Sequence, residues 1–318
     1  MPAGPHAPVV ALAGGVGAAR FLRGLVRAVP AEAVTAIVNT GDDRTFYGLC
    51  VSPDLDIVTY TLAGRVDAER GWGLAGDSFA AVDALGAFGH ETWFRLGDRD
   101  LATCLHRTIR LREGAGLAAA TDEIRRALGV ATRILPMSED PCPTIVELSG
   151  GRRLHFEEYL VRDGAPSDVE AVDLAAARAA RPAPGVIDAL RAARTILVCP
   201  SNPVVSIAPI LAVPGVRDAI ARSGAPVVAI SPIVGGAPLK GPADRLLRAI
   251  GAEVSARGVA RLYRDLAQGF VLDCRDAEHV RDVEALGLRA LAVDTIMRDA
   301  GASEALARAT LELADRLQ

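Results

Sequence analysis

Short apolar runs rich in valine, isoleucine and leucine alternate with amphipathic stretches along most of the chain. Several runs are apolar at consecutive positions rather than at alternate ones, which is typical of strands that helices cover on both faces. This alternation predicts an α/β fold with a Rossmann-like, doubly wound and mostly parallel sheet. The predicted strands are Val9–Ala13, Thr35–Asn39, Ile196–Cys199, Val227–Ile230, Phe270–Asp273 and Leu288–Val293.

The amphipathic stretches carry apolar residues at helical spacing and predict helices that follow the strands. In one of them, Thr121 precedes Asp122 and Glu123, and acidic residues are favoured in the first turn of a helix. The predicted helices are Ala18–Ala28, Asp100–Arg112, Thr121–Leu128, Val186–Ala193, Ala243–Ile250 and Glu304–Leu317.

The regular alternation is lost in the middle third of the chain. Thr144–Leu148 and Leu154–Tyr159 flank a Ser-Gly-Gly turn there, which predicts a β-hairpin. We therefore expect a smaller α+β subdomain to be inserted into the main sheet domain. The expected parts are residues 1–130 as the N-terminal half of the α/β core, 131–184 as the inserted subdomain and 185–318 as the C-terminal half.

One uncharged run, Thr195–Val216, is long enough to span a bilayer at 22 residues. Its prolines at positions 200, 203, 209 and 214 would remove backbone hydrogen bonds from a membrane helix, so we predict a buried strand, a loop and a helix instead. The start of the chain lacks a secretion-signal pattern, and the five cysteines have no C-x-x-C spacing. These features favour a cytoplasmic location and no membrane partner.

Charge limits the class of partner. The chain has 35 lysines and arginines against 39 aspartates and glutamates, a formal net charge of −4, and only 4% aromatic residues. This composition argues against a nucleic-acid-binding protein and favours small-molecule ligands. Lys240 is the only lysine; it could contact a phosphate at a helix start, but a solvated surface charge is the simpler interpretation.

The first predicted strand runs into Gly14-Gly15-Val16-Gly17 and then into a helix that contains Arg20. Glycines let the backbone approach a ligand closely, and the amides of a helix N-terminus favour an anion such as phosphate. The segment is neither the dinucleotide fingerprint, since Arg20 replaces its third glycine, nor a P-loop. Gly14, Gly15, Gly17 and Arg20 are therefore candidate nucleotide-binding residues, although a tight turn without a ligand would give the same pattern.

Four aspartates follow the second predicted strand within a short segment. Asp42, Asp43, Asp54 and Asp56 would repel one another if they converged, unless a cation held them together. Oxygen ligands without nearby histidine or cysteine suit Mg²⁺. In the alternative interpretation, Asp54 is a helix cap and Asp42 a turn residue.

Further polar groups follow later strands. Ser201, Asn202 and Ser206 lie between prolines after the strand at 196–199, and such groups suit a nucleobase edge or a phosphate. Arg99 precedes a predicted helix, where it could bind a phosphate or a polar ring edge, or point into solvent. Trp72, Trp93, Phe79 and Phe94 could line a pocket for a flat ring, or belong to the core.

Taken in this order, these segments resemble the 2-phospho-L-lactate transferase family of deazaflavin coenzyme (factor 420) biosynthesis. The resemblance runs from the glycine turn at 14–17 through 39–43, 52–56, 96–100 and 136–140 to 200–211 and 231–236. Arg20 is similar to the actinobacterial members, whereas archaeal members tend to have lysine at that position.

The resemblance implies a Mg²⁺-dependent transferase that joins the deazaflavin alcohol Fo to a guanosine-diphosphate-linked three-carbon acid and releases GMP. The acid is 2-phospholactyl or phosphoenolpyruvyl, and the sequence does not distinguish them. The resemblance also implies that Asp54, Asp56 and Arg99 contact Fo, and it implies a homodimer.

The residues suggest a mechanism of alignment and charge neutralisation. In this hypothesis, Gly15 and Gly17 hold the diphosphate, and Asp43, Asp54 and Asp56 hold Mg²⁺. Alternatively, one of these aspartates, Asp54 or Asp56, accepts the proton of the attacking hydroxyl instead of binding the ion. Two rival functions are a non-enzymatic nucleotide-binding regulator similar to the gluconeogenesis-factor family and a dinucleotide-dependent dehydrogenase. The acidic segment argues against the first, and the missing third glycine argues against the second.

Overall fold

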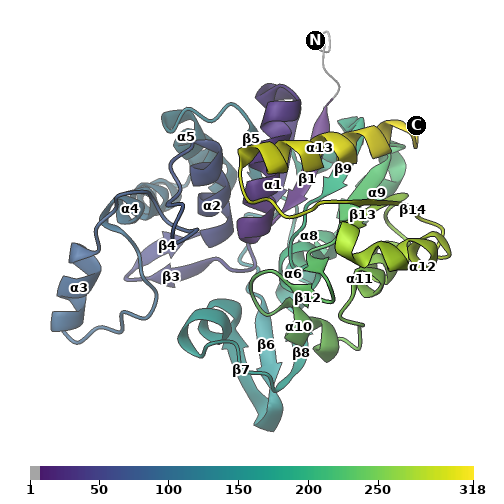
Figure 1. Cartoon of the computed structure of the whole chain (residues 1–318). Coiled ribbons are helices and arrows are strands. Elements are labelled where there is room, and N and C mark those ends of the chain that lie inside the picture. Colours follow the sequence, from purple (N-terminus) through teal and green to yellow (C-terminus); the bar gives the residue numbers. More distant parts are fainter. Residues whose placement is uncertain (1–7) are drawn as a thin grey trace.

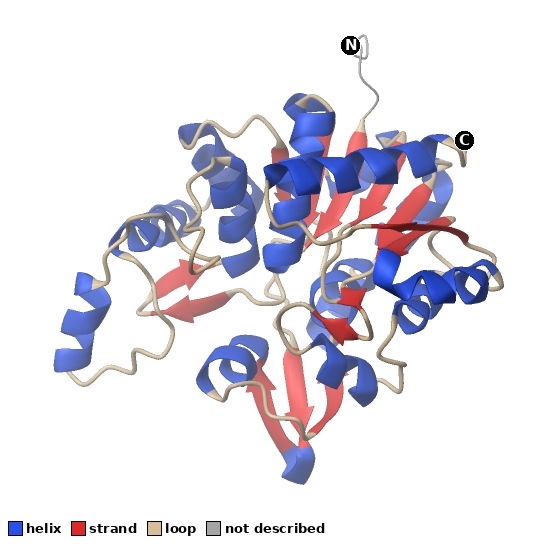
Figure 2. Cartoon of the chain, viewed as in Figure 1, coloured by secondary structure: helices blue, strands red, loops and turns tan. Residues whose placement is uncertain are grey.

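Seven parallel strands form the central sheet of the computed structural model, which describes residues 8–318. The strand order is β14-β13-β10-β9-β1-β2-β5, and Figures 1 and 2 show helices on both sides of it. The predicted fold class is confirmed. The strands are β1 (Val9–Ala13), β2 (Val34–Val38), β5 (Arg133–Pro136), β9 (Thr195–Val198), β10 (Val227–Ile230), β13 (Gly269–Asp273) and β14 (Arg289–Val293).

The consecutive apolar residues of the strands serve both faces of the sheet. In β1 all five residues are buried; Val10 and Leu12 belong to one hydrophobic cluster, and Val9, Ala11 and Ala13 belong to the other. Because side chains alternate between the faces of a strand, only an unbroken apolar run fills two cores at once. The same pattern that predicted these strands therefore explains why they lie in the middle of the molecule.

Two sets of helices cover the sheet. Figure 1 shows α1 and α13 side by side on one face, and their packed residues belong to one hydrophobic cluster. That face carries α1 (Gly15–Ala28), α2 (Pro53–Leu62), α5 (Leu117–Ala127) and α13 (Ala300–Asp315). The other face carries α7 (Val186–Ala192), α8 (Ala208–Ala212), α9 (Val216–Ser223), α10 (Ala243–Ala249), α11 (Ala256–Tyr263) and α12 (Val280–Glu284).

Several helices begin earlier than the sequence predicts. Helix α5 begins at Leu117 rather than Thr121, because the side chain of Glu139, from a distant loop, accepts a hydrogen bond from the Ala118 N–H. Helix α13 begins at Ala300 rather than Glu304, since Asp299 accepts from the Ala302 N–H. The predicted cap at Thr121 was wrong, because a cap from a distant segment leaves no local pattern.

The middle of the chain contains the predicted hairpin and a third strand. Strands β6 (Ile145–Leu148) and β7 (Arg152–His155) are antiparallel, and β8 (Val169–Asp173) pairs with the other side of β6. The hairpin ends at His155 because residues 158–162 turn into a short π-helix. Residues 133–136, which the sequence analysis assigned to this part, form β5 of the main sheet instead. Figure 1 shows β6, β7 and β8 below the main sheet.

An outer layer of two strands and two helices lies beside the main sheet. The hairpin of β3 (Arg44–Phe46) and β4 (Leu49–Val51) follows β2, and α3 (Ala80–Ala87) precedes α4 (Asp98–Arg112). A third hydrophobic cluster joins Phe46 and Val51 of the hairpin to Val82 and Cys104 of these helices. It holds the hairpin and these two helices together, and α4 makes polar contacts with α2, between Arg107 and Asp56 and between Asp100 and Tyr60. Helix α6 (Ala175–Ala179) and the hairpin of β11 (Ile233–Val234) and β12 (Ala237–Pro238) are the remaining elements named in the text.

The long uncharged run folds as predicted into β9, a loop with the π-helical turn Pro203–Ile207, and α8. Within residues 8–318 no single helix is long and apolar enough to cross a membrane. The helical segments Pro203–Ala212 and Val216–Ser223 reach that length and composition only as a pair, and they are bent by 83° at the break between them.

The strand order reverses its direction of growth between β1 and β9. From β1 the sheet grows through β2 to β5 on one side, and from β9 it grows through β10 and β13 to β14 on the other. At such a point the loops after the two strands leave in opposite directions and open a crevice, which is the usual ligand site of this kind of sheet. The loops in question are residues 14–17 after β1 and 199–206 after β9.

Candidate functional site

A cavity of about 730 Å³ opens at this crevice and extends to the unit built on β6, β7 and β8, which we call the subdomain. Its size is typical of a site for small molecules. It is lined by the carboxyl ends of β1, β9 and β10, by α2, and by Phe156, Glu157, Leu160 and Val161 of the subdomain. Nine of the predicted site residues line it, namely Gly14, Gly15, Gly17, Arg20, Asp54, Asp56, Ser201, Asn202 and Ser206.

Gly14 lies where three segments meet. A Cβ atom at this position would lie 2.7 Å from Cβ of Ser206 and 2.9 Å from Oδ2 of Asp54, so no larger residue fits. At Gly17 a Cβ atom would collide with the carbonyl oxygen of Pro200. Gly15 has a φ of +72°, a conformation that favours glycine. Each glycine of the predicted loop therefore has a packing or backbone reason to be there.

Asp54, in the first turn of α2, is the central acid of the site. Its Oδ1 accepts a hydrogen bond of 2.7 Å from the Gly15 N–H, and its Oδ2 accepts one of 3.0 Å from Nδ2 of Asn39. Burial raises the pKa of Asp54 to about 6, although both hydrogen bonds act in the opposite direction. The Gly15 amide is thus engaged by Asp54, and the amides left for a ligand are the following ones of the first turn of α1.

Three more carboxyl groups surround Asp54. Asp43 accepts a hydrogen bond of 2.7 Å from Ser52, but its Oδ1 and the Oδ1 of Asp42 are buried without a hydrogen-bond partner within residues 8–318. Burial raises the pKa of both well above the usual range, and Asp54 and Glu157 raise that of Asp42 further. Burial and then Asp54 raise the pKa of Glu157 to about 8. We call Asp42, Asp43, Asp54 and Glu157 the acid cluster.

Asp56 lies in a different environment. Its Oδ1 forms an ion pair with Arg107, which is only 1% exposed and also donates to the carbonyl of Cys50 at 3.2 Å. Nearby, Asp100 accepts a hydrogen bond of 2.7 Å from the Tyr60 hydroxyl, and burial raises its pKa to about 7. Here the chain supplies its own cation. We call Asp56, Asp100, Tyr60 and Arg107 the arginine network.

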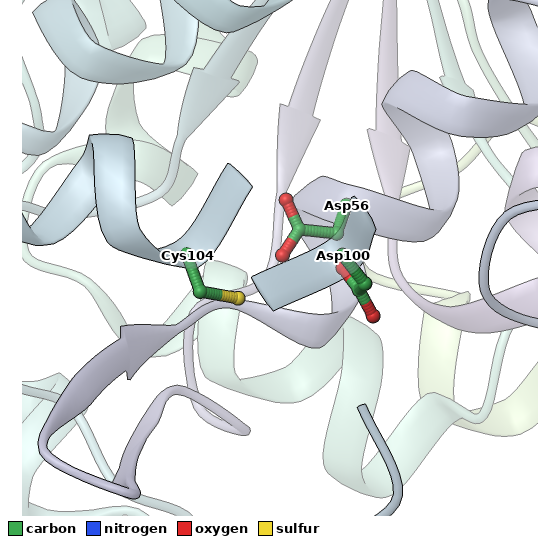
Figure 3. A group of neighbouring side chains, drawn as sticks. All are labelled: Asp56, Asp100 and Cys104. Carbon is green, nitrogen blue, oxygen red and sulfur yellow. The ribbon is translucent and has the colours of Figure 1, made fainter. Parts of the chain in front are cut away.

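Asp56, Asp100 and Cys104 are the only group in residues 8–318 whose possible metal-binding atoms all lie within 4.8 Å of one another. Figure 3 shows Asp56 on α2 beside Asp100 and Cys104 on α4. Burial raises the pKa of the Cys104 thiol, and Arg107 already neutralises Asp56. A sulfur ligand next to an arginine does not suit Mg²⁺.

The acid cluster fits a divalent cation better. It offers oxygen ligands, including two buried carboxylate oxygens without a hydrogen-bond partner, and none of its carboxyls forms an ion pair with a basic side chain of residues 8–318. Burial raises the pKa of Asp43 and outweighs the opposite effect of Arg107. Its oxygens do not all lie within 4.8 Å of one another, but Mg²⁺ usually keeps several waters and needs only one or two carboxylates. The residues present therefore fit the ion that the sequence analysis expects.

The loop after β9 uses part of its polar groups for its own structure. Ser201 donates a hydrogen bond of 2.8 Å to the carbonyl of Gly14, which ties the two crevice loops together. Oδ1 of Asn202 accepts from the Val204 N–H at 2.9 Å and caps the helical turn that follows. Ser206 lines the cavity beside Gly14.

Aromatic residues form one wall of the cavity. Trp72, Trp93 and Phe94 line it, whereas Phe79 lies behind Trp72 with its ring centre 6.1 Å away. Phe46 stacks on Phe94 at 3.9 Å with an angle of 7° between the rings. The wall is thus apolar and fixed from behind, as a flat ring would require.

Arg99 and Asp43 do not line the cavity. Arg99 is exposed, its N–H donates to Asp77 at 3.0 Å, and its guanidinium reaches the carbonyl of Ala75 at 3.5 Å. Asp43 lies behind Asp42 and Ser52. The sequence analysis did not select Glu157, Arg107 or Tyr60. These three residues can be recognised as site residues only from their contacts with distant segments. Each lies in a stretch whose local sequence pattern is that of an ordinary helix or hairpin.

A model of the family described as 2-phospho-L-lactate transferase CofD matches residues 9–308. The chain belongs to this family. The predicted resemblance is confirmed, and with it the assignment to transferase enzymes rather than to the regulators or dehydrogenases considered above.

Two curated relatives illustrate the range of the family. The chain is 47% identical over 315 residues to the phosphoenolpyruvate transferase of Streptomyces griseus, an alignment that covers 98% of this chain and 99% of that one. It is 38% identical over 304 residues to the 2-phospho-L-lactate transferase of Methanosarcina mazei, with coverage of 96% and 99%. Both similarities extend over nearly the whole chain, subdomain included.

Among solved structures, the chain is similar to a protein of the UPF0052 family from Bacillus halodurans. The TM-score is 0.64 at 19% identity, with 97% of this chain and 100% of that one covered. A second crystal structure of the protein gives a TM-score of 0.61 at 20% identity. This likeness supports the fold.

Proposed function

We propose that the chain transfers a phosphoenolpyruvyl or 2-phospholactyl group from a guanosine-diphosphate-linked donor to the deazaflavin alcohol Fo, with release of GMP. The names of its relatives support the transferred group. The observation that carries the proposal is the cavity at the β1–β9 crevice, because it combines a helix N-terminus, a cluster of carboxylates and an aromatic wall. These are the parts that a phosphate, a divalent cation and a flat ring need.

The donor binds at the loops after β1 and β9. The free amides of the first turn of α1, which starts at Gly15 and includes Gly17, face the diphosphate, and Arg20 lies one turn further along the helix. Ser201, Asn202 and Ser206 line the opposite side. Because Ser201 is bonded to Gly14, the two halves of this anion site keep a fixed spacing.

The acceptor binds against the aromatic wall. A deazaflavin ring is flat and largely apolar, so it stacks on Trp72, Trp93 or Phe94, with Leu160 and Val161 of the subdomain on the other side. Its hydroxyl then points toward the acids at the other end of the cavity. In this arrangement Asp54 and Asp56 contact Fo as the resemblance implies. The exposed Arg99 contributes to Fo binding only if the loop around Ala75 turns it toward the cavity.

Mg²⁺ is the expected cation. Asp43 would hold it with Asp42 and with whichever of Asp54 and Asp56 does not accept the proton; Asp56 has one carboxylate oxygen that Arg107 leaves open. When bound, the ion would neutralise charge on the phosphorus under attack and on the departing phosphate. The unpartnered oxygens of Asp42 and Asp43 support this assignment.

The chain's own acids move the proton. The Fo hydroxyl oxygen forms a bond to the phosphorus that carries the three-carbon acid, the bond from that phosphorus to the GMP oxygen breaks, and GMP leaves as a phosphate anion. The hydroxyl proton passes to Asp54, whose pKa of about 6 leaves it ionised at neutral pH and still able to accept a proton. Asp56, held by Arg107, is the alternative acceptor.

The test is a direct assay. Purified protein is mixed with Fo, Mg²⁺ and either the phosphoenolpyruvyl or the 2-phospholactyl donor, and GMP release is followed together with the mass of the product. The proposal requires equal amounts of GMP and of the Fo adduct with one of the two donors. Binding of guanine nucleotides without GMP release would contradict it. The homodimer implied by the resemblance stays a prediction, which light scattering of the same preparation tests.

A further inference from the structure

Lys240 occupies a defined position at the mouth of the cavity. It follows the β11–β12 hairpin, whose turn residues Gly235 and Gly236 have φ values of 58° and 76°. The Gly235 N–H donates to Oδ2 of Asp276 at 2.9 Å, which fixes the hairpin to the main domain. The chain's only lysine therefore follows an anchored hairpin by two residues, and it lines the cavity.

Arg20 reaches the same place from the other side of the crevice. A Cβ atom on Gly71 would lie 3.5 Å from Nζ of Lys240 and 3.8 Å from Nη2 of Arg20. Gly71 belongs to a loop that is held by its own hydrogen bonds, since the Asp67 side chain accepts from the Arg70 N–H at 2.9 Å and the Asp67 carbonyl accepts from the Gly71 N–H, also at 2.9 Å. Three distant segments thus bring two cations together over one backbone turn.

Neither cation has an acidic partner within 4.0 Å among residues 8–318. The other cations that line the cavity are paired, Arg95 with Asp83 at 2.6 Å and Arg298 with Asp294. Two positive charges repel each other when they lie close together. Because Arg20 and Lys240 lack an acidic partner in the described part of the chain, their arrangement favours the binding of an anionic ligand. The acid cluster does not provide it, because Asp54 is held by Gly15 and Asn39.

We propose that Lys240 and Arg20 together bind anionic oxygens of the donor at the cavity mouth. This inference rests on the proposed function and deepens it, since it assigns a second substrate-binding cation to the same site. Arg20 offers a planar fork of donors and Lys240 a compact charge with three donors, so the pair can hold two oxygens at once. The two cations then hold one end of the donor at the cavity mouth, away from the acid cluster.

The anionic oxygens have two possible sources in the donor, the diphosphate and the carboxylate of the three-carbon acid. Lys240→Gln removes the charge, Lys240→Arg keeps it, and Arg222→Gln removes an exposed charge far from the cavity as a matched control. For each variant, calorimetry gives the Kd of GDP and of GMP, and the GMP-release assay gives KM for the donor and kcat.

We expect Lys240→Gln to weaken donor binding about tenfold, as for the loss of one charge-assisted hydrogen bond, with kcat within about twofold. Lys240→Arg restores most of the affinity, and Arg222→Gln matches the wild type. If Lys240 contacts the diphosphate, Lys240→Gln raises the Kd of GDP and leaves the Kd of GMP unchanged. A contact to the carboxylate leaves both nucleotides unchanged and raises the donor KM.

An unchanged GDP Kd together with an unchanged donor KM in Lys240→Gln would overturn the inference. So would failure of Lys240→Arg to recover affinity, because a charge contact does not depend on the shape of the lysine alone. Wild-type protein that binds GDP but turns over neither donor would count against the proposed function, and the GDP arm would still decide whether Lys240 binds a diphosphate.

Discussion

Asp54 and Asp56 are two residues apart on α2, yet they belong to opposite kinds of environment. Asp56 is in the arginine network, where a buried guanidinium neutralises it. Asp54 is in the acid cluster, where the neighbouring groups are further carboxyls with raised pKa values. The comparison teaches that a buried carboxylate whose counter-charge comes from the fold depends on that partner for stability, whereas one without a counter-charge is available to a cation or a proton from outside.

The largest effect should come from the arginine network. Arg107→Met removes the cation and leaves Asp56 buried without compensation, so we expect the free energy of unfolding to fall by about 3–5 kcal/mol. Urea unfolding followed by circular dichroism measures it. Arg44→Met, which breaks the partly exposed pair with Glu158, is the matched control and should cost at most about 1 kcal/mol. Equal losses in the two variants would contradict the comparison.

Asp54→Asn tests the acid cluster through activity. The amide keeps the size of the side chain but neither binds a cation strongly nor accepts the proton, so turnover should fall about 10³-fold. The melting temperature should stay within a few degrees of the wild type, since no buried ion pair is broken. GMP release and thermal unfolding are the two measurements. Retained turnover in a folded variant would remove Asp54 from the mechanism.

Mg²⁺ should stabilise the protein through the acid cluster. At an ion concentration about a hundred times its Kd, binding to the folded state adds about 2.7 kcal/mol, so the melting temperature rises on addition of the salt. Asp43→Asn should reduce this rise, whereas Asp100→Asn, a buried acid of the arginine network, should keep it. Differential scanning calorimetry with and without Mg²⁺ gives the two shifts. If only Asp100→Asn abolished the Mg²⁺-dependent rise in melting temperature, the cation would bind at the arginine network instead.

Glu157 gives the smallest effect over a single pH unit, and this effect appears only when the pH is varied. Its pKa is raised to about 8 in the folded chain from a usual value of 4.5, so folding favours its protonated form. The corresponding stability is present below pH 4.5 and is lost as the pH rises through 8, by on the order of 1.4 kcal/mol for each pH unit. Glu157→Gln should flatten this decline. Parallel stability curves for the variant and the wild type, measured without divalent cations, would show that Glu157 stays ionised.

The sequence predicted cavity residues correctly where a ligand-binding position also needs a particular backbone geometry. The turn after β1 has three glycines with separate steric reasons. Of the four acids after β2, Asp42, Asp43 and Asp54 lie together, whereas Asp56 pairs with Arg107. The same reasoning failed for Arg99, because an arginine beside a helix start has the same local pattern whether it faces a cavity or solvent. Lys240 was the reverse case, a residue interpreted as a surface charge that lines the cavity.

The sequence by itself determined six of the seven strands of the parallel sheet, with β1 and β10 predicted to the residue, because an unbroken apolar run is best buried between two cores. It did not predict β5. It also determined the glycine turn and the concentration of acids beside it. Only the tertiary structure decided which acids meet a cation. Arg107 occurs on the amphipathic helix α4, and its partner Asp56 comes from α2, 51 residues away in the sequence. A charge can be buried only where another segment neutralises it, and such pairing between distant segments leaves no periodic pattern in the chain.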